Sequence, residues 1–392
     1  GGERGIFEVT AVGDLELRDL TLKDAKGAMG AAIYSDGVVT TKNVDFINNS
    51  VKLELENLDH VLTDGLGGAV YSSGKFTAEG GSFKNNSASE FGGAIFSMGD
   101  LKLTNVAFEG NSAYVGGAVS AYRGSLFVDG GTFQSNVAER GGAVYTLVDA
   151  TFIGATFINN EATGTQNEPL PGVGGAVYAH RDARLTFLSP KFVSGDEEAS
   201  NVAVVLTGNK AAGSGGAVYA EGGIDVVQGD FIATGNVAGN ADYTGLSEFA
   251  AGGAVCTRSP FEVEGNLVMT DNASTGSYGA AYLNGDFRVT GDVDFSGSKA
   301  LNGDFGAIAA TNVEIGGNLT ANDVKANEKG FVVYSKNGVK VGGDVNASRT
   351  VGGAIYAAAG GVEIGGDLVA ESNVAKIAAA VRAGLAVQID GS

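Results

Sequence analysis

Few residues of the chain have side chains suited to acid–base or nucleophilic chemistry. The two histidines lie in separate charged clusters, His60 next to Asp59 and His180 next to Arg181 and Asp182. Such clusters could supply the acid and base of polysaccharide cleavage, which lie about 6.5–9.5 Å apart in inverting hydrolysis. Neither cluster has a matching acid or base one repeat away in the sequence, so we interpret both as solvated turns.

Metal and thiol chemistry have equally little support. The single cysteine, Cys256, can form no internal disulfide, and no histidine lies near it in sequence. Gly-[Asp/Asn] turns recur in the second half and could align carboxylates for Ca²⁺, but Asn266 and Asn318 interrupt the column. The column consists of Asp230, Asn266, Asp292, Asn318, Asp344 and Asp367. We therefore expect no catalytic residue, no cofactor and no metal site.

The tetrapeptide Gly-Gly-Ala-[Val/Ile] recurs along the chain, and the residues discussed above lie at different places within or between its repeats. Eight strict copies end at Val70, Ile95, Val119, Val144, Val177, Val218, Val255 and Ile355. The first four are 25, 24 and 25 residues apart, a period typical of a repeated supersecondary unit rather than of one globular domain. Weakened copies around Ile33, Ala281, Ile308, Val333 and Val381 bring the number to thirteen.

The repeat predicts strands without helices. From Gly92 to Asn111, short apolar runs alternate with turn residues, and no run keeps helical spacing. Such strands stay equivalent only if each lies parallel to its counterpart in the next repeat, about 4.8 Å along the axis. Parallel crossovers favour the right-handed sense. The sequence therefore predicts an all-β fold, a right-handed single-stranded parallel β-helix of about 13 coils.

The motif residues have structural roles in such a coil. Two glycines permit a tight turn, alanine fits a crowded corner and valine fills the interior, as at Gly67, Gly68, Ala69 and Val70. A Phe-x-x-Asn motif accompanies them, as at Phe83/Asn86 and Phe108/Asn111. Its Phe is expected to fill the core, and its Asn to take the left-handed conformation and to hydrogen-bond to the Asn of the next coil.

The motifs divide the chain into two sections. Residues 1–255 have complete coils with insertions, and residues 256–392 form a continuous section in which Met269/Asn272 and Leu319/Asn322 replace the Phe/Asn pair. Three insertions leave from one corner, between Asn49 and Gly67, Asn160 and Gly174, and Asn236 and Gly252, and a fourth spans Leu188 to Ser200. Loops on a rigid scaffold often carry recognition, although a surface corner also tolerates drift.

An aromatic residue follows the motif in most coils. Because side chains alternate along a strand, this residue is expected to point outward and to form a ladder on one face. The ladder that could bind a ligand consists of Tyr34, Tyr71, Phe96, Tyr145, Tyr178 and Tyr219. Two interpretations remain open, a stack that stabilises the sheet and a contact surface for glycan or protein.

Composition limits the partners. The net charge of −20 repels nucleic acid and anionic membrane surfaces. The longest apolar stretch, Ile377 to Val387, is short and interrupted by Arg382, so we expect no membrane insertion by this segment. We expect the segment to continue into further coils or a C-terminal barrel in the full protein, because repeat stacks usually need caps and neither end has one.

The pairing of Gly-Gly-Ala-[Val/Ile] with Phe-x-x-Asn, once per coil, resembles the repeats of the chlamydial polymorphic membrane proteins. The resemblance covers residues 30–255 strongly and the remainder weakly. Members of that family resemble autotransporters, in which a β-helical passenger is displayed on the bacterial surface by an outer-membrane barrel. The resemblance implies adhesion to host cells, with the repeat motifs themselves involved. The near absence of cysteine departs from the chlamydial members.

These patterns together favour a non-catalytic adhesin segment on the bacterial cell surface, either secreted or anchored to the outer membrane. Its partner is expected to be a protein or glycan of a host or neighbouring cell, bound through side loops or the aromatic face. Two alternatives remain: a polysaccharide lyase or hydrolase on a pectin-lyase-like β-helix, and a structural stalk.

Overall fold

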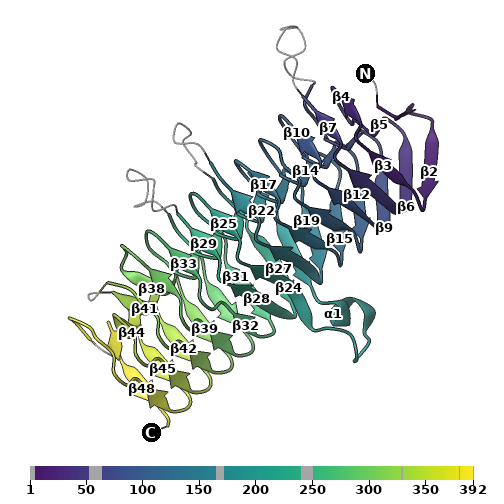
Figure 1. Cartoon of the computed structure of the whole chain (residues 1–392). Coiled ribbons are helices and arrows are strands. Elements are labelled where there is room, and N and C mark those ends of the chain that lie inside the picture. Colours follow the sequence, from purple (N-terminus) through teal and green to yellow (C-terminus); the bar gives the residue numbers. More distant parts are fainter. Residues whose placement is uncertain are drawn as a thin grey trace. The chain divides into compact units, whose positions relative to one another are not determined.

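A computed structural model describes residues 5–52, 64–164, 172–239, 250–327, 330–378 and 380–391 of the chain. The chain divides into two compact units, Gly1–Leu185 and Thr186–Ser392, which we treat separately. In both units nearly all regular structure is β-strand, and strands of successive coils pair in parallel (Figure 1). The predicted parallel β-helix is therefore confirmed.

The first strand of each coil begins at or near the apolar residue of the tetrapeptide motif. Ile95, for example, is paired in register with Val70 on one side and Val119 on the other. In the first unit these strands are β1 (Phe7–Val9), β5 (Ile33–Ser35), β8 (Val70–Ser72), β11 (Ile95–Ser97), β14 (Val119–Ala121), β18 (Val144–Thr146) and β22 (Val177–Ala179). In the second they are β26 (Val218–Ala220), β30 (Val255–Thr257), β34 (Ala281–Leu283), β38 (Phe305–Ala310), β41 (Phe331–Ser335), β44 (Gly353–Ala357) and β47 (Val381–Ala383).

The described residues thus hold fourteen strands of this kind, one more than the thirteen coils expected. The additional strand is β1, which pairs with β5 from Phe7 and Ile33 onward but carries no tetrapeptide motif. Apolar and polar residues alternate over only a few positions in β1, so the sequence shows no repeat motif by which to recognise this coil.

Two further ladders complete the wall of each coil. In the first unit they contain β2 (Asp14–Arg18), β3 (Thr21–Lys23), β6 (Val38–Ile47), β9 (Phe76–Lys84), β12 (Leu101–Thr104), β13 (Ala107–Glu109), β15 (Leu126–Asp129), β16 (Thr132–Gln134), β19 (Ala150–Ile153) and β20 (Ala155–Ile158). The strands β6 and β9 are long enough to take part in both ladders. The division between the two units falls within β23 (Leu185–Leu188).

The second unit repeats this arrangement with shorter strands. One ladder contains β27 (Ile224–Gln228), β31 (Phe261–Glu264), β35 (Phe287–Val289), β39 (Val313–Ile315), β42 (Val339–Val341), β45 (Val362–Ile364) and β48 (Val387–Ile389). The other contains β24 (Val202–Thr207), β28 (Asp230–Thr234), β32 (Leu267–Val268), β36 (Val293–Asp294), β40 (Leu319–Thr320), β43 (Val345–Asn346) and β46 (Leu368–Val369).

Two-residue strands mark one corner, and a single short helix is described. The corner strands are β4 (Lys26–Gly27), β7 (Ser50–Val51), β10 (Ser87–Ala88), β17 (Val137–Ala138) and β21 (Glu161–Ala162) in the first unit, and β25 (Lys210–Ala211), β29 (Val237–Ala238), β33 (Ala273–Ser274) and β37 (Lys299–Ala300) in the second. The helix α1 (Pro190–Ser194) lies on an excursion from the second unit (Figure 1). Ser189 caps its start and Gly195, at φ +69°, ends it.

A column of stacked phenylalanines fills the interior of the first unit. It consists of Phe46, Phe83, Phe108, Phe133 and Phe157, all fully buried. Neighbouring ring centroids are 4.4 to 5.0 Å apart and the rings are nearly parallel. Such offset stacks add to the free energy of burial, so the predicted core role of these residues is confirmed.

A column of buried asparagines runs beside the rings. The Oδ1 of Asn111 accepts hydrogen bonds from the backbone N and the Nδ2 of Asn86, at 2.9 and 3.0 Å. The Nδ2 of Asn111 donates to the carbonyl of Phe83 and to Oδ1 of Asn136, each at 2.9 Å. Both donors and both acceptor sites of the amide are therefore satisfied. The predicted bond from each Asn to the next is confirmed.

The predicted left-handed conformation of the motif Asn is wrong. The left-handed residue is the one before it, at Asn48, Asn85 and Asn159, with φ between +51° and +56°. Gly110 and Ser135 occupy the same place in their coils, at φ +64° and +54°. This left-handed residue turns the chain, so that the motif Asn that follows can point inward and bond along the column.

The column continues in the second unit with mixed side chains. By strand register it consists of Asn209, Asn236, Asn272, Ser298, Val324, Thr350 and Asn373. Asn209 and Asn236 donate from Nδ2 to the next Asn Oδ1 at 3.0 Å, as in the first unit. Asn322 lies two residues before the column position, so the expectation that Leu319/Asn322 continues the motif is wrong.

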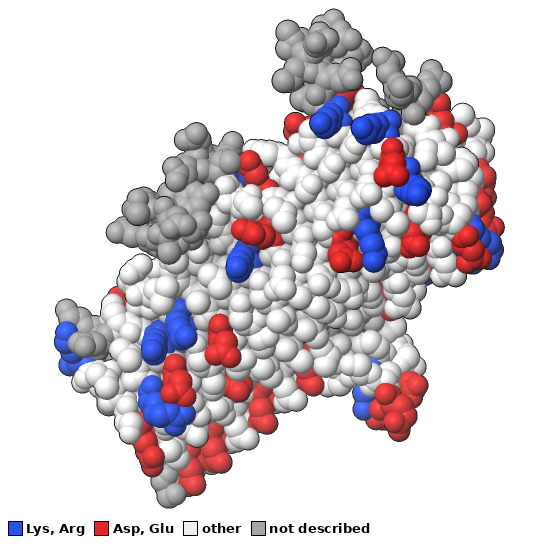
Figure 2. Space-filling model, viewed as in Figure 1, with Lys and Arg blue, Asp and Glu red and all other residues white. Residues whose placement is uncertain are grey.

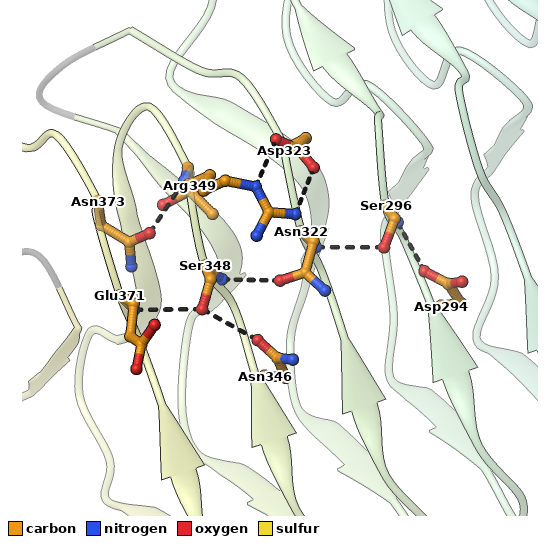
Figure 3. A network of polar contacts seen from close by, with 10 residues as sticks. Asp294, Ser296, Asn322, Asp323, Asn346, Ser348, Arg349, Glu371 and Asn373 are labelled. Atoms are coloured by element: carbon orange, nitrogen blue, oxygen red, sulfur yellow. Dashed lines mark hydrogen bonds and ion pairs between the residues drawn. The ribbon is translucent and has the colours of Figure 1, made fainter.

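A polar network on turns replaces the missing column bonds (Figure 3). The backbone N of Asn322 donates to Ser296 Oγ at 3.2 Å, and Asn322 Oδ1 accepts from the backbone N of Ser348 at 3.0 Å. The Oγ of Ser348 in turn accepts from the backbone N of Glu371 at 3.2 Å. Each coil is thus tied to the next by a side chain and a backbone N–H.

The Gly-[Asp/Asn] turns form a similar ladder on the exterior. Asn266 Oδ1 accepts from the backbone N of Asp292 at 2.9 Å, and Asp292 Oδ1 accepts from that of Asn318 at 2.7 Å. Only an acceptor oxygen is needed, which explains why both Asp and Asn occur in this ladder. In the described residues no group of three or more His, Cys, Asp or Glu could hold a metal ion.

The two motif glycines differ in what they require. Gly67 has φ +65°, a conformation that L side chains rarely adopt. Gly68 has ordinary φ, but a Cβ there would collide with the carbonyl oxygen of Gly93 in the next coil. The tetrapeptide therefore marks a corner where backbones approach closely, and Ala69 and Val70 behind it are fully buried.

Several sequence predictions fall outside what the structure describes. His60 and Asp59, with most of the first insertion, and the central parts of the second and third insertions lie outside the described residues. The boundary at residue 255 reflects a change of motif and stays a prediction, whereas the two compact units divide after Leu185.

Replacement of Asn111 by alanine is expected to lower the free energy of unfolding by about 1–3 kcal/mol, because the buried backbone N–H of Asn86 loses its acceptor. Asn266→Ala, in the exposed ladder, is the matched control and should change it by less than about 0.5 kcal/mol. Urea unfolding measures both. Equal effects of the two substitutions would contradict the role assigned to the buried column.

Candidate functional site

Aromatic rings cover the outer face of the first ladder in the first unit. The rings of Tyr34 and Tyr71 stack at 5.0 Å, and those of Tyr71 and Phe96 at 5.7 Å. Tyr145 and Tyr178 follow in an edge-on arrangement at 5.4 Å. We call the following set the aromatic belt: Tyr34, Tyr71, Phe91, Phe96, Tyr122, Tyr145, Tyr178 and His180. It includes five of the six ladder residues expected from sequence.

The belt stays continuous where the ladder residue is small. Ser120 stands at that position in β14, and its Oγ donates to the carbonyl of Val115 at 2.9 Å. The ring of Tyr122 fills the space, 5.2 Å from Phe96 and 6.0 Å from Tyr145. Phe91 packs against Tyr122 at 5.2 Å. Sequence reasoning missed Phe91 and Tyr122, although Tyr122, two residues after the Ser120 interruption, was a signal.

His180 belongs to the belt rather than to a solvated turn. The Tyr145 hydroxyl lies 2.6 Å from His180 Nδ1, and the imidazole centroid is 5.2 Å from that of Tyr178. The backbone N of His180 donates to the carbonyl of Thr146 at 2.9 Å. Its neighbour Arg181, at φ +61°, makes the turn that brings the imidazole onto the rings.

Exposure along the belt is uneven. Phe96, Tyr145 and Tyr178 are only 4%, 6% and 2% exposed. Tyr34, Tyr71, Phe91, Tyr122 and His180 are half-buried and form the accessible part. A ligand would therefore meet these five residues, with the buried rings as their support. The sixth ladder residue, Tyr219, lies in the second unit and is 7% exposed.

The accessible tyrosine hydroxyls of the belt are uncharged near neutral pH. Burial raises the pKa of the Tyr71 hydroxyl above its ordinary value, and Tyr34 and Asp36 add to the shift. Burial also raises the pKa of Tyr122, while Arg181 opposes that shift. The accessible surface thus combines flat apolar rings with neutral hydroxyl groups, which donate and accept hydrogen bonds.

A second row of rings lies on the equivalent face of the second unit. Ala309 occupies the ladder position of β38, between Tyr282 and Tyr334. The ring of Phe305 spans this position, with its centroid 5.3 Å from that of Tyr278 and 4.6 Å from that of Tyr334. The row ends where the guanidinium of Arg382 lies 4.6 Å above the ring of Tyr356.

Cys256 interrupts the ladder in the second unit. It is buried, and burial raises the pKa of its thiol to about 12, so the thiol is protonated and a poor nucleophile at neutral pH. Its neighbour Tyr219 also has a pKa raised by burial, with Arg258 opposing the shift.

Two stretches of the chain, residues 80–98 and 203–221, match the family model described as the Chlamydia polymorphic membrane protein repeat. The first runs through Phe83, Asn86 and Ile95, and the second through Asn209 and Val218. No curated protein and no solved structure gives a match. The one helix in the described part is too short to cross a membrane.

Tyr278 is expected to make the second unit sensitive to alkali. Burial first, then Tyr282 and Tyr334, raise its pKa from 10.0 to about 12. The neutral hydroxyl is favoured in the folded state, so its stabilising effect is complete below pH 10 and is lost as the pH rises toward 12. Urea midpoints across this range should fall less steeply for Tyr278→Phe than for the parent protein. An identical fall in both proteins would contradict the shift.

Proposed function

Because the chain carries repeats of the chlamydial polymorphic membrane protein type, we propose that it is part of a surface-displayed autotransporter passenger. In this proposal it lies outside the bacterial outer membrane and binds a protein or glycan of a host or neighbouring cell. The accessible part of the aromatic belt makes the contact. The segment has no catalytic role.

The continuity of the belt carries this proposal. A ladder that served only to stack coils would need one ring per coil. Tyr122 restores the ring missing at Ser120, and Phe91 adds a second ring to the coil of Phe96, so the surface is unbroken and broader than one ring. Tyrosine and phenylalanine offer large contact areas with few rotatable bonds, so little entropy is lost on binding. Exposed contiguous aromatic surface often marks a binding site.

The absence of catalysis is proposed from the state of the reactive groups. The one histidine in the described part, His180, is engaged by Tyr145 at 2.6 Å, and the buried Cys256 thiol is held neutral. The rival function as a polysaccharide lyase or hydrolase would be supported by any turnover of uronans or neutral glycans by the segment.

A structural stalk is the other candidate, and ring stacking at 5.0 Å between Tyr34 and Tyr71 favours it because such contacts also stabilise the coils. If the belt tyrosines serve only to stack the coils, loss of their hydroxyl groups leaves cell binding unchanged. Replacement of belt tyrosines by phenylalanine and by alanine therefore separates a contact role from a purely structural one.

The double substitution Tyr71→Ala and Tyr122→Ala is expected to weaken binding of the labelled segment to target cells by about 30-fold or more, as for loss of a hot-spot residue. Phe127→Ala is the matched control, since Phe127 is a half-buried outer ring on the neighbouring ladder, beneath Lys102. Its binding should be unchanged. Binding curves on cells measure the effect, with urea midpoints to confirm folding. Equal binding by all three proteins would refute the belt as the contact surface.

A further inference from the structure

An open pocket lies where the α1 excursion meets the coils of the second unit. Its volume is about 280 Å³, and its lining includes Lys191, Phe192, Glu197, Asn201, Gln228 and Glu264. Acidic side chains gather over this excursion (Figure 2). None of the lining residues belongs to the aromatic belt, to the tetrapeptide or to the Phe-x-x-Asn motif, and Gly229, also in the lining, belongs to the Gly-Asp turn of Asp230.

Backbone hydrogen bonds fix the shape of the pocket. The backbone N of Ser189 donates to the carbonyl of Gln228, and that of Asp230 donates to the carbonyl of Asn201, each at 2.7 Å. Both ends of the excursion are therefore tied to one turn, residues 228–230. Gly229 at its centre has φ +110°, and a Cβ there would lie 2.6 Å from the Cβ of Ser189, so only glycine fits.

The lining combines one exposed ring with planar polar groups. Phe192 is 55% exposed and is the aromatic residue of the lining. Gln228 Nε2 donates to Glu264 Oε2 at 2.8 Å, which orients both side chains. The ammonium of Lys191 lies 2.6 Å from Glu197 Oε2 and holds the pKa of that carboxyl below its ordinary value.

These groups match the surface of a neutral sugar. A pyranose has an apolar face of C–H groups that packs on an aromatic ring, and hydroxyls that donate to carboxylates and amide oxygens. Glu197, Glu264 and Gln228 supply acceptors, and Asn201 and Lys191 supply donors. With two carboxylates and one ammonium in the lining, an anionic ligand such as a uronate or phosphate would be repelled.

We propose that this pocket binds a neutral, hydroxyl-rich sugar unit of a cell-surface glycan, with Phe192 as the ring platform. The proposal rests on the proposed function in binding at cell surfaces and names a ligand class for a second site on the chain. It requires none of the residues of the belt.

The test titrates the full chain with neutral methyl pyranosides, glucuronate and inorganic phosphate, and follows binding by ligand-observed NMR. A neutral pyranoside is expected to bind with a Kd of about 1 mM, typical of a small ligand in an open site. Phe192→Ala and Asn201→Ala should each weaken binding by about 10-fold or more. Val193→Ala, in the same helix, 53% exposed and outside the lining, should leave binding unchanged.

Three results would overturn the inference: no binding of any neutral pyranoside, binding that survives both Phe192→Ala and Asn201→Ala, or tighter binding of glucuronate or phosphate. If no sugar binds but cell binding still depends on the belt, only the pocket proposal is refuted. If the sugar binds and the Tyr71→Ala/Tyr122→Ala variant still binds cells normally, the pocket proposal stands and the belt is refuted as the contact surface.

Discussion

The buried asparagine column is the interaction on which the rest of the structure depends. In the first unit the amides of Asn86, Asn111 and Asn136 each use two donors and two acceptor sites, so the column is stable only in one register. A slip of one residue would bury unpaired amide and backbone groups and would turn the stacked phenylalanines away from the interior. Changes in coil length are therefore confined to corners and excursions away from the column.

The fixed register explains why outer rings on different coils can cooperate. Coils rise about 4.8 Å, so rings in adjacent coils stack, but a ring missing from one coil leaves a gap of about 9.6 Å, beyond the reach of ring contacts. The gap at Ser120 in the first unit and the gap at Ala309 in the second are bridged by rings from flanking positions. The same solution therefore occurs in two separate coils of the chain. Cys256, between Tyr219 and Tyr282, is a further interruption of the ladder in the second unit.

The sequence predicted features that repeat and missed those that depend on neighbouring coils. The phenylalanine stack and the bonds between asparagines follow from a pattern in every coil. The left-handed residue before the Asn was misplaced because Asn, Gly and Ser all occur there. Phe91, Tyr122 and His180 were missed because they lie outside the ladder position, and only the fold brings them onto it. Asn322 was misassigned because the column position of its coil holds Val324, and an Asn two residues earlier reproduces the motif spacing from Leu319, which only strand register distinguishes.

Charge restricts how either proposed surface can act. The net charge of −20 repels anionic cell surfaces at long range, but screening in physiological salt limits that repulsion to about 8 Å. Binding must therefore come from short-range contacts, which the neutral hydroxyls and rings of the belt and the ring and amides of the α1 pocket can provide. Because neither surface relies on a cluster of basic groups, there is little electrostatic attraction for added salt to weaken. In both proposals recognition depends on shape and hydrogen bonding, and the asparagine column, by fixing the register, sets the shape.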